Sequence, residues 1–323
     1  MRSVGGLLSE PKWMATCCAV GATGLGIAYM NAAGAPLRYP ALNAGALIVG
    51  IALAGLLTTI RDSGRHGAGL GTLALGAFLL ATSLFGVSVN GATRWITFGG
   101  LSLQPSLLVI PLMLVRFARS RDSVSLLGLA LACVAVALQP DRAMAGTLFV
   151  GLLTLATLRR ERVVSTALAI SLAGFVVTLM QLDMQPAMPF VDQIFFTSFE
   201  VHPLAGLAVL GGAVLLIAPV LVGRTTDAEI RHAYVLFGAT WLTVSVAAAL
   251  GNYPTPVVGY GGSAIIGYVL SAFALPAVEA HSVAPWREAQ RPTAKDPRDL
   301  PGNPITETPG SDRTGLARRV HIG

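Results

Sequence analysis

Charged residues and cysteine are scarce in this chain, and each shortage excludes a class of protein. Only 12% of its 323 residues are charged, 54% are apolar, and the mean hydropathy is +0.68. A soluble domain usually carries about 25% charged residues to cover its surface. Cys17, Cys18 and Cys133 lie inside apolar stretches and show neither metal-ligand nor disulfide spacing. A soluble fold, a zinc site and a disulfide framework are therefore not indicated.

Long apolar stretches take the place of the missing charge. A membrane-spanning helix needs about 20 apolar residues to cross a hydrocarbon core about 30 Å thick. The sequence predicts ten such stretches, at about 13–33, 39–60, 67–89, 101–118, 122–139, 143–158, 162–183, 203–223, 230–250 and 256–277. The predicted fold class is therefore all-α, a polytopic integral membrane bundle of about ten transmembrane helices.

The cations predict the orientation of this bundle. The net charge is +6, and twenty of the 22 cations are Arg that stand mainly between the apolar stretches, which does not indicate nucleic-acid binding. Loops after even-numbered stretches hold ten Arg, namely Arg61, Arg65, Arg116, Arg119, Arg121, Arg159, Arg160, Arg162, Arg224 and Arg231. Loops after odd-numbered stretches hold only Arg38, Arg94 and Arg142. Because cytoplasmic loops are enriched in Lys and Arg, both termini are predicted to be cytoplasmic.

Composition also predicts the domain organisation. Residues 1–280 form one membrane domain, in which no strong internal repeat is visible, so the inverted repeats of many secondary transporters are missing. Residues 281–323 are rich in Pro, Arg, Asp and Thr and cannot bury enough apolar surface to order themselves. We expect a disordered cytoplasmic tail there.

Two outer loops carry unusual polar residues. Arg94 suits bidentate contact with a phosphate, and equally suits lipid headgroups at the membrane interface. The polar run that contains Gln104 leads into an apolar stretch, where Pro105 fits a helix N-terminus. Asp141 fits a helix N-cap, and equally a ligand or base at a cavity mouth.

The loop after the seventh stretch is acidic, with Asp183, Asp192, Glu200 and His202 and no cation. Carboxylates at a membrane edge are candidate functional residues. They can hold Mg²⁺ or Mn²⁺ through oxygen ligands, or deprotonate a hydroxyl nucleophile. His202, which stands before a proline, is typical of a cap or surface residue.

A glycine-rich segment, Gly259–Ser263, precedes the last apolar stretch. Consecutive glycines adopt backbone conformations that other residues avoid, and their N–H groups can cradle an anion. Close helix packing explains Gly261 and Gly262 equally well.

Taken together, these segments resemble the SEDS family of bacterial cell-wall polymerases, typified by FtsW, RodA and SpoVE. The family's N-G-A-x-R-W-I-x-x-G and S-L-Q-P-S-E are similar to Asn90–Ile96, with Gly99 or Gly100, and then Ser102–Ser106. Its Q-P-D-x-G-T resembles Gln139–Asp141, with a Gly-Thr pair further on, and its S-Y-G-G-S resembles Gly259–Ser263. The resemblance covers residues 10–277.

The resemblance implies a function. SEDS proteins polymerise glycan strands from lipid II, an undecaprenyl-pyrophosphate disaccharide, in the bacterial cytoplasmic membrane, usually beside a class B penicillin-binding protein. Asp192 stands in a segment similar to that of the proposed family catalytic Asp and would deprotonate the acceptor sugar hydroxyl. Arg94, with backbone donors and a divalent cation, Mg or Mn, would stabilise the leaving pyrophosphate. The expected substrate-binding residues are Arg94, Gln104, Asp141, Glu200, Tyr260, Gly261, Gly262 and Ser263.

The chain also departs from the family pattern. Leu107 replaces the Glu after Gln-Pro-Ser, no Lys follows in 108–114, and the outer loop after the seventh stretch has about 20 residues. Three hypotheses follow: a divergent peptidoglycan glycosyltransferase, an inactive SEDS-like protein that binds division or elongation partners, and a transporter of lipid-linked precursors. The chain is predicted to be a multi-pass protein of the bacterial cytoplasmic membrane.

Overall fold

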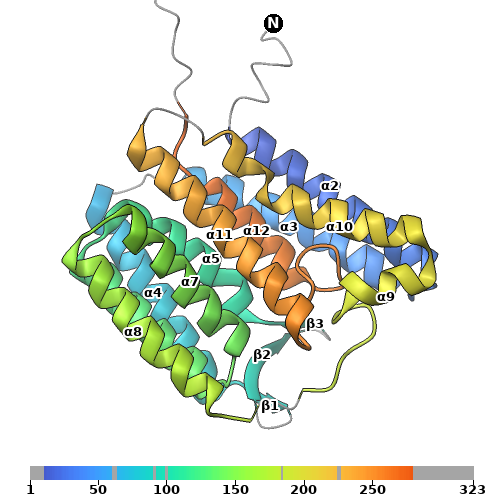
Figure 1. Ribbon diagram of the computed structural model, residues 1–323, viewed down its shortest axis with the longest axis horizontal. Helices are drawn as coiled ribbons and strands as arrows, with labels where there is room; N and C mark the ends of the chain where they lie inside the picture. The colour runs from blue at the N-terminus through green and yellow to red at the C-terminus, as the bar shows by residue number, and fades with distance from the viewer. Residues whose placement is uncertain are drawn as a thin grey trace, which may run out of the picture. The chain divides into compact units, whose positions relative to one another are not determined.

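The computed structural model describes residues 11–59, 64–89, 92–98, 101–182, 185–223 and 227–278 as a helical bundle with a small sheet at one end (Figure 1). The predicted tail at 281–323 and its boundary at 280 lie outside the described residues. The helices are α2 (Pro11–Ala32), α3 (Arg38–Thr59), α4 (Gly64–Phe85), α5 (Pro105–Ser120), α6 (Ser123–Leu138), α7 (Arg142–Leu158), α8 (Arg162–Leu179), α9 (Ile194–Val201), α10 (Pro203–Ile217), α11 (Ala228–Leu250) and α12 (Gly262–Phe273). A 3-10 turn, Ala218–Leu221, extends α10.

Each of the ten predicted stretches contains a helix. Among the described residues, six helices (α2, α3, α4, α8, α10 with its 3-10 extension, and α11) are long and apolar enough to cross a membrane, while α6, α7 and α12 are shorter apolar helices. The all-α membrane class is confirmed, whereas ten crossings stay a prediction.

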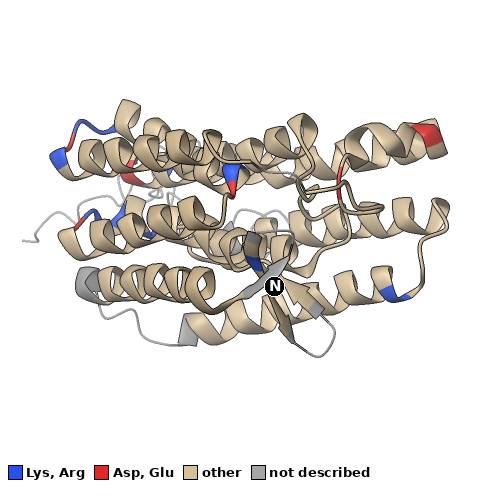
Figure 2. Cartoon of the chain, turned by 90° about the horizontal axis from the view of Figure 1, so that it is seen from below, with Lys and Arg blue, Asp and Glu red and all other residues tan. Residues whose placement is uncertain are grey.

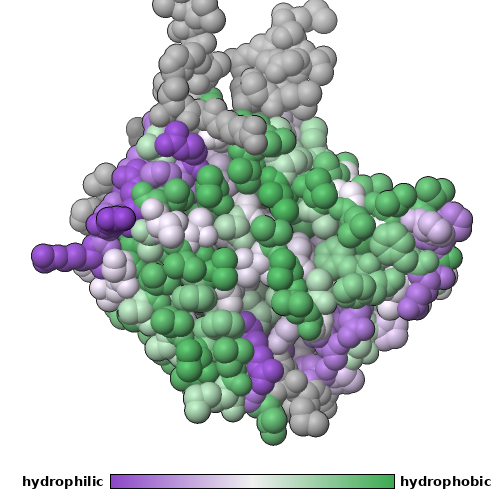
Figure 3. Space-filling view, in the orientation of Figure 1, coloured by the Kyte–Doolittle hydropathy of each residue, from purple (hydrophilic) through white to green (hydrophobic). Residues whose placement is uncertain are grey.

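The core runs through the middle of the bundle. Most residues of α5 and α12 are buried, and α12 packs against both α3 and α5. The outer helices expose large apolar side chains, such as Ile48 and Leu56 on α3, and apolar surface covers much of the visible face (Figure 3). Such a surface is stable in lipid and not in water.

Helices α4 and α6 approach so closely that their backbones touch. A Cβ built on Gly76 would stand 2.1 Å from the carbonyl oxygen of Gly128, and one on Gly128 would stand 2.5 Å from that of Thr72. Only glycine fits at these two positions, as is common where membrane helices pack through small residues.

Three helix ends differ from the sequence prediction, because polar loop structure starts earlier than the apolar composition suggests. Helix α4 ends at Phe85 rather than 89, and β1 (Val87–Val89), β2 (Ala92–Phe98) and β3 (Leu101–Leu103) form an antiparallel sheet in the order β1-β2-β3. Helix α5 therefore begins only at Pro105. In the last predicted stretch only Gly262–Phe273 is helical, since the residues before it form a loop.

The charged loops gather as predicted at one end of the bundle. Arg121 binds Glu161 at 3.1 Å and Glu229 at 3.0 Å, and Arg159 also pairs with Glu229. These ion pairs join the ends of α5, α7 and α11, and Figure 2 shows most described Lys and Arg there. The outer-face segments also contact one another: Arg94 bonds to the turn before α7, Gln104 to Ser263, and the 254–260 loop to the 190–192 segment.

Candidate functional site

A buried polar network joins three of the predicted segments. The Asp141 carboxylate is fully buried and accepts hydrogen bonds from Gln104 Nε2 at 3.0 Å, from the Ser106 hydroxyl at 2.8 Å and from the Met144 N–H at 3.2 Å. The Gln104 N–H donates to the Ser263 hydroxyl at 2.8 Å. Asp141 therefore acts as the N-cap of α7 and also as the anchor that joins α7 to α5.

Arg94 is placed differently from the sequence expectation. Only 3% of the residue is exposed; its Nε donates to the Gln139 carbonyl at 3.0 Å, and its Nη2 donates to the Pro140 carbonyl. In this position the guanidinium supports the turn that carries Asp141 and does not face outward. This position does not support the predicted contact with pyrophosphate, because the guanidinium is buried and donates to two backbone carbonyls.

A cavity of about 550 Å³ opens beside this network. Its wall includes Gln104, Ser263 and the loop residues Tyr260, Gly261 and Gly262, together with Trp95 and the apolar Leu107. No Asp, Glu, Lys or Arg is among the described lining residues. Amide, hydroxyl and indole groups suit the hydroxyls of a neutral sugar, so the structure brings five predicted binding residues to one cavity that can hold such a group.

Asp192 lies on the other side of one cavity wall. It lines a second pocket of about 440 Å³ with Glu200, Tyr29 and Thr197, whereas its neighbour Val191 lines the 550 Å³ cavity. Met188 lines both. The segment 188–192 is therefore the partition between a neutral cavity and a pocket that holds two carboxylates.

The Asp192 carboxylate is only lightly hydrogen-bonded. The residue is 9% exposed, and its Oδ2 accepts one bond from the Met188 N–H at 2.8 Å. Burial raises the pKa of Asp192 above its ordinary value, and the Met188 N–H opposes that rise. A buried-edge carboxylate with a raised pKa and unused acceptor positions is suited to take a proton.

The Asp192 loop is held by the loop before α12. The Thr255 N–H donates to the Val191 carbonyl at 2.8 Å, the Tyr260 N–H donates to the Phe190 carbonyl at 2.7 Å, and Asp192 pairs with Pro254 in an isolated bridge. Three non-glycine residues at these loops have positive φ, namely Phe190 at 64°, Gln193 at 58° and Val257 at 65°. Such conformations each cost about 1–3 kcal/mol and gather at functional sites.

The remaining acidic-loop predictions have separate outcomes. The side chain of His202 caps α10 by accepting from the Leu204 N–H at 3.1 Å, which confirms the cap interpretation. Asp183 lies outside the described residues. Within the described ranges no three His, Cys, Asp or Glu residues gather as metal ligands. A Mg²⁺ or Mn²⁺ ion here would need oxygen ligands from a substrate beside Asp192 and Glu200.

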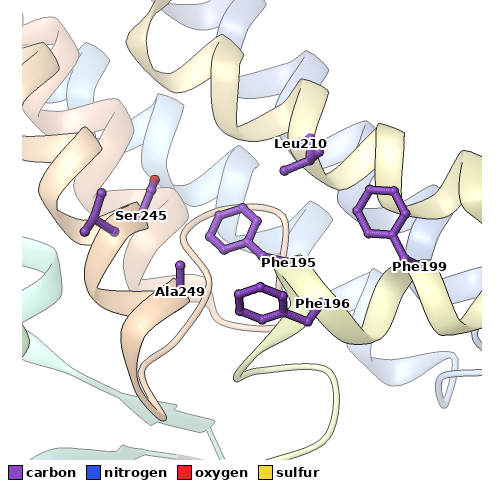
Figure 4. Close-up of a pocket in the computed structure, with 7 residues that line it drawn as sticks. Phe195, Phe196, Phe199, Leu210, Ser245 and Ala249 are labelled. Atoms are coloured by element: carbon purple, nitrogen blue, oxygen red, sulfur yellow. The ribbon is translucent and has the colours of Figure 1, made fainter.

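A third pocket, of about 590 Å³, lies between α9, α10 and α11 (Figure 4). Its wall is formed by Phe195, Phe196, Phe199, Leu210, Ser245, Val246 and Ala249. Its described lining offers an apolar surface and holds no Asp, Glu, His, Lys or Arg.

Two residues at the site escaped the sequence analysis. Asn43 of α3 is buried and hydrogen-bonded to the 259–261 loop, and Tyr39 stacks on Tyr260 with ring centroids 4.0 Å apart. A polar amide inside an apolar span was the available indication for Asn43, since such residues pair within membrane bundles. Nothing local in the sequence indicates the partner of Tyr39.

Comparison with known proteins decides the family. The sequence model of the FtsW/RodA/SpoVE cell cycle proteins matches residues 34–194. The chain belongs to this family. The match contains β2, the Gln104 and Asp141 segments and Asp192, so the FtsW/RodA/SpoVE assignment rests on most of the site.

Solved structures show the same fold at low identity. Thermus thermophilus RodA, a rod shape determining protein, is 21% identical with a TM-score of 0.58, over 81% of this chain and 95% of that one. A chain from a peptidoglycan synthase complex that coordinates polymerization and crosslinking is 20% identical with a TM-score of 0.53, over 81% and 96%. None of the curated proteins matches this FtsW/RodA/SpoVE member in sequence.

Proposed function

We propose that this protein is a peptidoglycan glycosyltransferase that polymerises lipid II at the outer face of the bacterial cytoplasmic membrane, in cell division or cell-shape maintenance. The observation that carries the proposal is Asp192. It is a lightly bonded carboxylate in the partition beside a neutral cavity, and it belongs to an FtsW/RodA/SpoVE fold. We also propose that the chain crosses the membrane several times and has both termini in the cytoplasm.

The proposed reaction uses the two sides of the partition. The 550 Å³ cavity holds a sugar through Gln104, Ser263 and Tyr260, and Asp192 takes the proton of the acceptor hydroxyl. That oxygen bonds to the anomeric carbon of the donor, and the bond from this carbon to the undecaprenyl pyrophosphate breaks with its electron pair. A divalent cation would supply positive charge to the departing pyrophosphate, and Glu200, which lines the Asp192 pocket, would hold it.

A class B penicillin-binding protein is the proposed partner. The solved peptidoglycan synthase complex supports this, because its name joins polymerization to crosslinking. A partner-binding role without chemistry is the second candidate, and one observation favours it: Leu107 places an apolar side chain where the family has Glu, on the cavity wall.

The deciding experiment is glycan-strand synthesis from purified lipid II, with and without the class B penicillin-binding protein of the same cell. We expect polymer from the wild type and a loss of about 100-fold or more with Asp192→Asn, since general bases contribute about 10²–10⁴-fold. Glu200→Gln is the matched control for a lost negative charge in the same pocket, and its loss is expected to be smaller and to depend on added Mg²⁺. A folded, partner-bound wild type that makes no polymer would favour the partner-binding role.

A further inference from the structure

Asn43 makes two hydrogen bonds that bracket one residue of the loop before α12. Its Nδ2 donates to the Gly259 carbonyl at 2.8 Å, and its Oδ1 accepts from the Gly261 N–H at 3.1 Å. These partners are 216 and 218 positions away in sequence, and Asn43 itself is fully buried. Because a buried amide is costly without partners, both bonds favour one position of this loop.

The loop that Asn43 holds is the loop that holds the Asp192 segment. Tyr260, between the two glycines, donates its N–H to the Phe190 carbonyl, two residues before Asp192. Tyr39 lies one turn before Asn43 on α3 and stacks on the Tyr260 ring with an interplanar angle of 11°. Helix α3 therefore fixes both the backbone and the side chain of Tyr260.

We infer that Asn43 is a positioning residue that holds Asp192 in the partition, through the 259–261 loop and the bond from Tyr260 to Phe190. Asn43 is not among the residues that line either pocket, so it acts through position and not by touching substrate. Its significance for catalysis rests on the proposed function, while the mechanical link stands without it.

The first test needs no activity. In the intact protein, hydrogen exchange of the Thr255 and Tyr260 amides, which donate to the Asp192 segment, is compared between wild type and Asn43→Leu. Loss of both bonds predicts exchange at least about tenfold faster at both amides. Asn43→Asp keeps the acceptor for Gly261 and loses the donor to Gly259, so it predicts an intermediate increase, and it serves should the leucine variant fail to fold.

Thr240→Val is the matched control. Thr240 is buried, and its hydroxyl bonds only within its own helix, to the Leu236 carbonyl at 2.8 Å. Its exchange at Thr255 and Tyr260 is expected to equal that of the wild type. Unchanged exchange at these amides in both Asn43 variants would overturn the inference.

The second test is the pH profile of kcat in the lipid II assay. Tyr29 from α2 and Glu200 from α9 are the titratable groups that share the pocket with Asp192, and neither lies on α3. If Asn43→Leu frees the loop, water reaches Asp192, the pKa of its carboxyl falls, and the acid limb of the kcat profile moves to lower pH. A variant that is only less stable has a lower maximal kcat, and its acid limb stays at the same pH. A limb that stays in place while activity falls contradicts the inference. A wild type without polymer defeats the proposed function, and hydrogen exchange still decides the role of Asn43.

Discussion

Two carboxylates stand at the same end of the bundle, and their surroundings differ. Asp141 is fully buried and accepts three hydrogen bonds, from Gln104, Ser106 and Met144. Asp192 lines a pocket and accepts one bond, from the Met188 backbone. The Asp141 carboxylate is buried, and its hydrogen bonds are made within the fold. The Asp192 carboxylate keeps acceptor positions for a proton or a cation, which is why the proposed reaction assigns the role of base to Asp192 and not to Asp141.

The largest effect that tests this comparison of Asp141 with Asp192 is on the free energy of unfolding. Asp141→Ala leaves the Gln104 amide, the Ser106 hydroxyl and the Met144 N–H without their acceptor, which predicts a loss of about 3 kcal/mol or more in the free energy of unfolding. Asp192→Ala frees one N–H near solvent and predicts a loss of about 1 kcal/mol or less. Unfolding in detergent measures both, and equal losses would remove the distinction.

A smaller effect is expected at Arg94, which supports the turn of Asp141. Arg94→Lys keeps the charge, but an ammonium cannot reproduce the planar fork that reaches both the Gln139 and Pro140 carbonyls. We expect a stability loss of about 1.5 kcal/mol with an unchanged KM for lipid II. A raised KM with unchanged stability would return Arg94 to the substrate role that the sequence suggested.

The smallest expected effect is on pH dependence, and it sharpens the account of Asp192. Burial raises the pKa of Asp192, and a base must be deprotonated, so activity should fall on acidification at a higher pH than for an ordinary carboxylate. The folded state also holds the proton to higher pH than the unfolded chain. Its contribution to stability is therefore fully present below the unfolded pKa and is lost as pH rises through the folded pKa.

Asp192→Asn tests both parts of that statement. The variant should lose the acid limb of any residual activity and the matching slope in a stability profile measured from acidic to neutral pH. Glu200→Gln shares the pocket and is the control, with Asp192's slope expected to remain. A slope that survives Asp192→Asn would place the raised pKa on another group.

The helices were predictable from sequence and the site only in part. Apolar length identified a helix in every predicted stretch, because each helix must bury a continuous apolar surface in the bundle or expose it to lipid. The sheet was missed because Val87–Val89 reads as the end of an apolar span until its pairing with β2 is known. Motifs located Gln104, Asp141 and Ser263, but the burial of Arg94 depends on carbonyls 45 and 46 residues away, which no local pattern reveals.

The contact between α4 and α6 has a consequence for how such a chain changes over generations. At Gly76 and Gly128 even one methyl group would separate two backbones. On the lipid-facing sides of α3, one large apolar residue serves as well as another. We therefore expect the lipid-facing positions of α3 to tolerate substitution far better than Gly76 and Gly128. A fold shared with Thermus thermophilus RodA at 21% identity is what such unequal tolerance would leave behind.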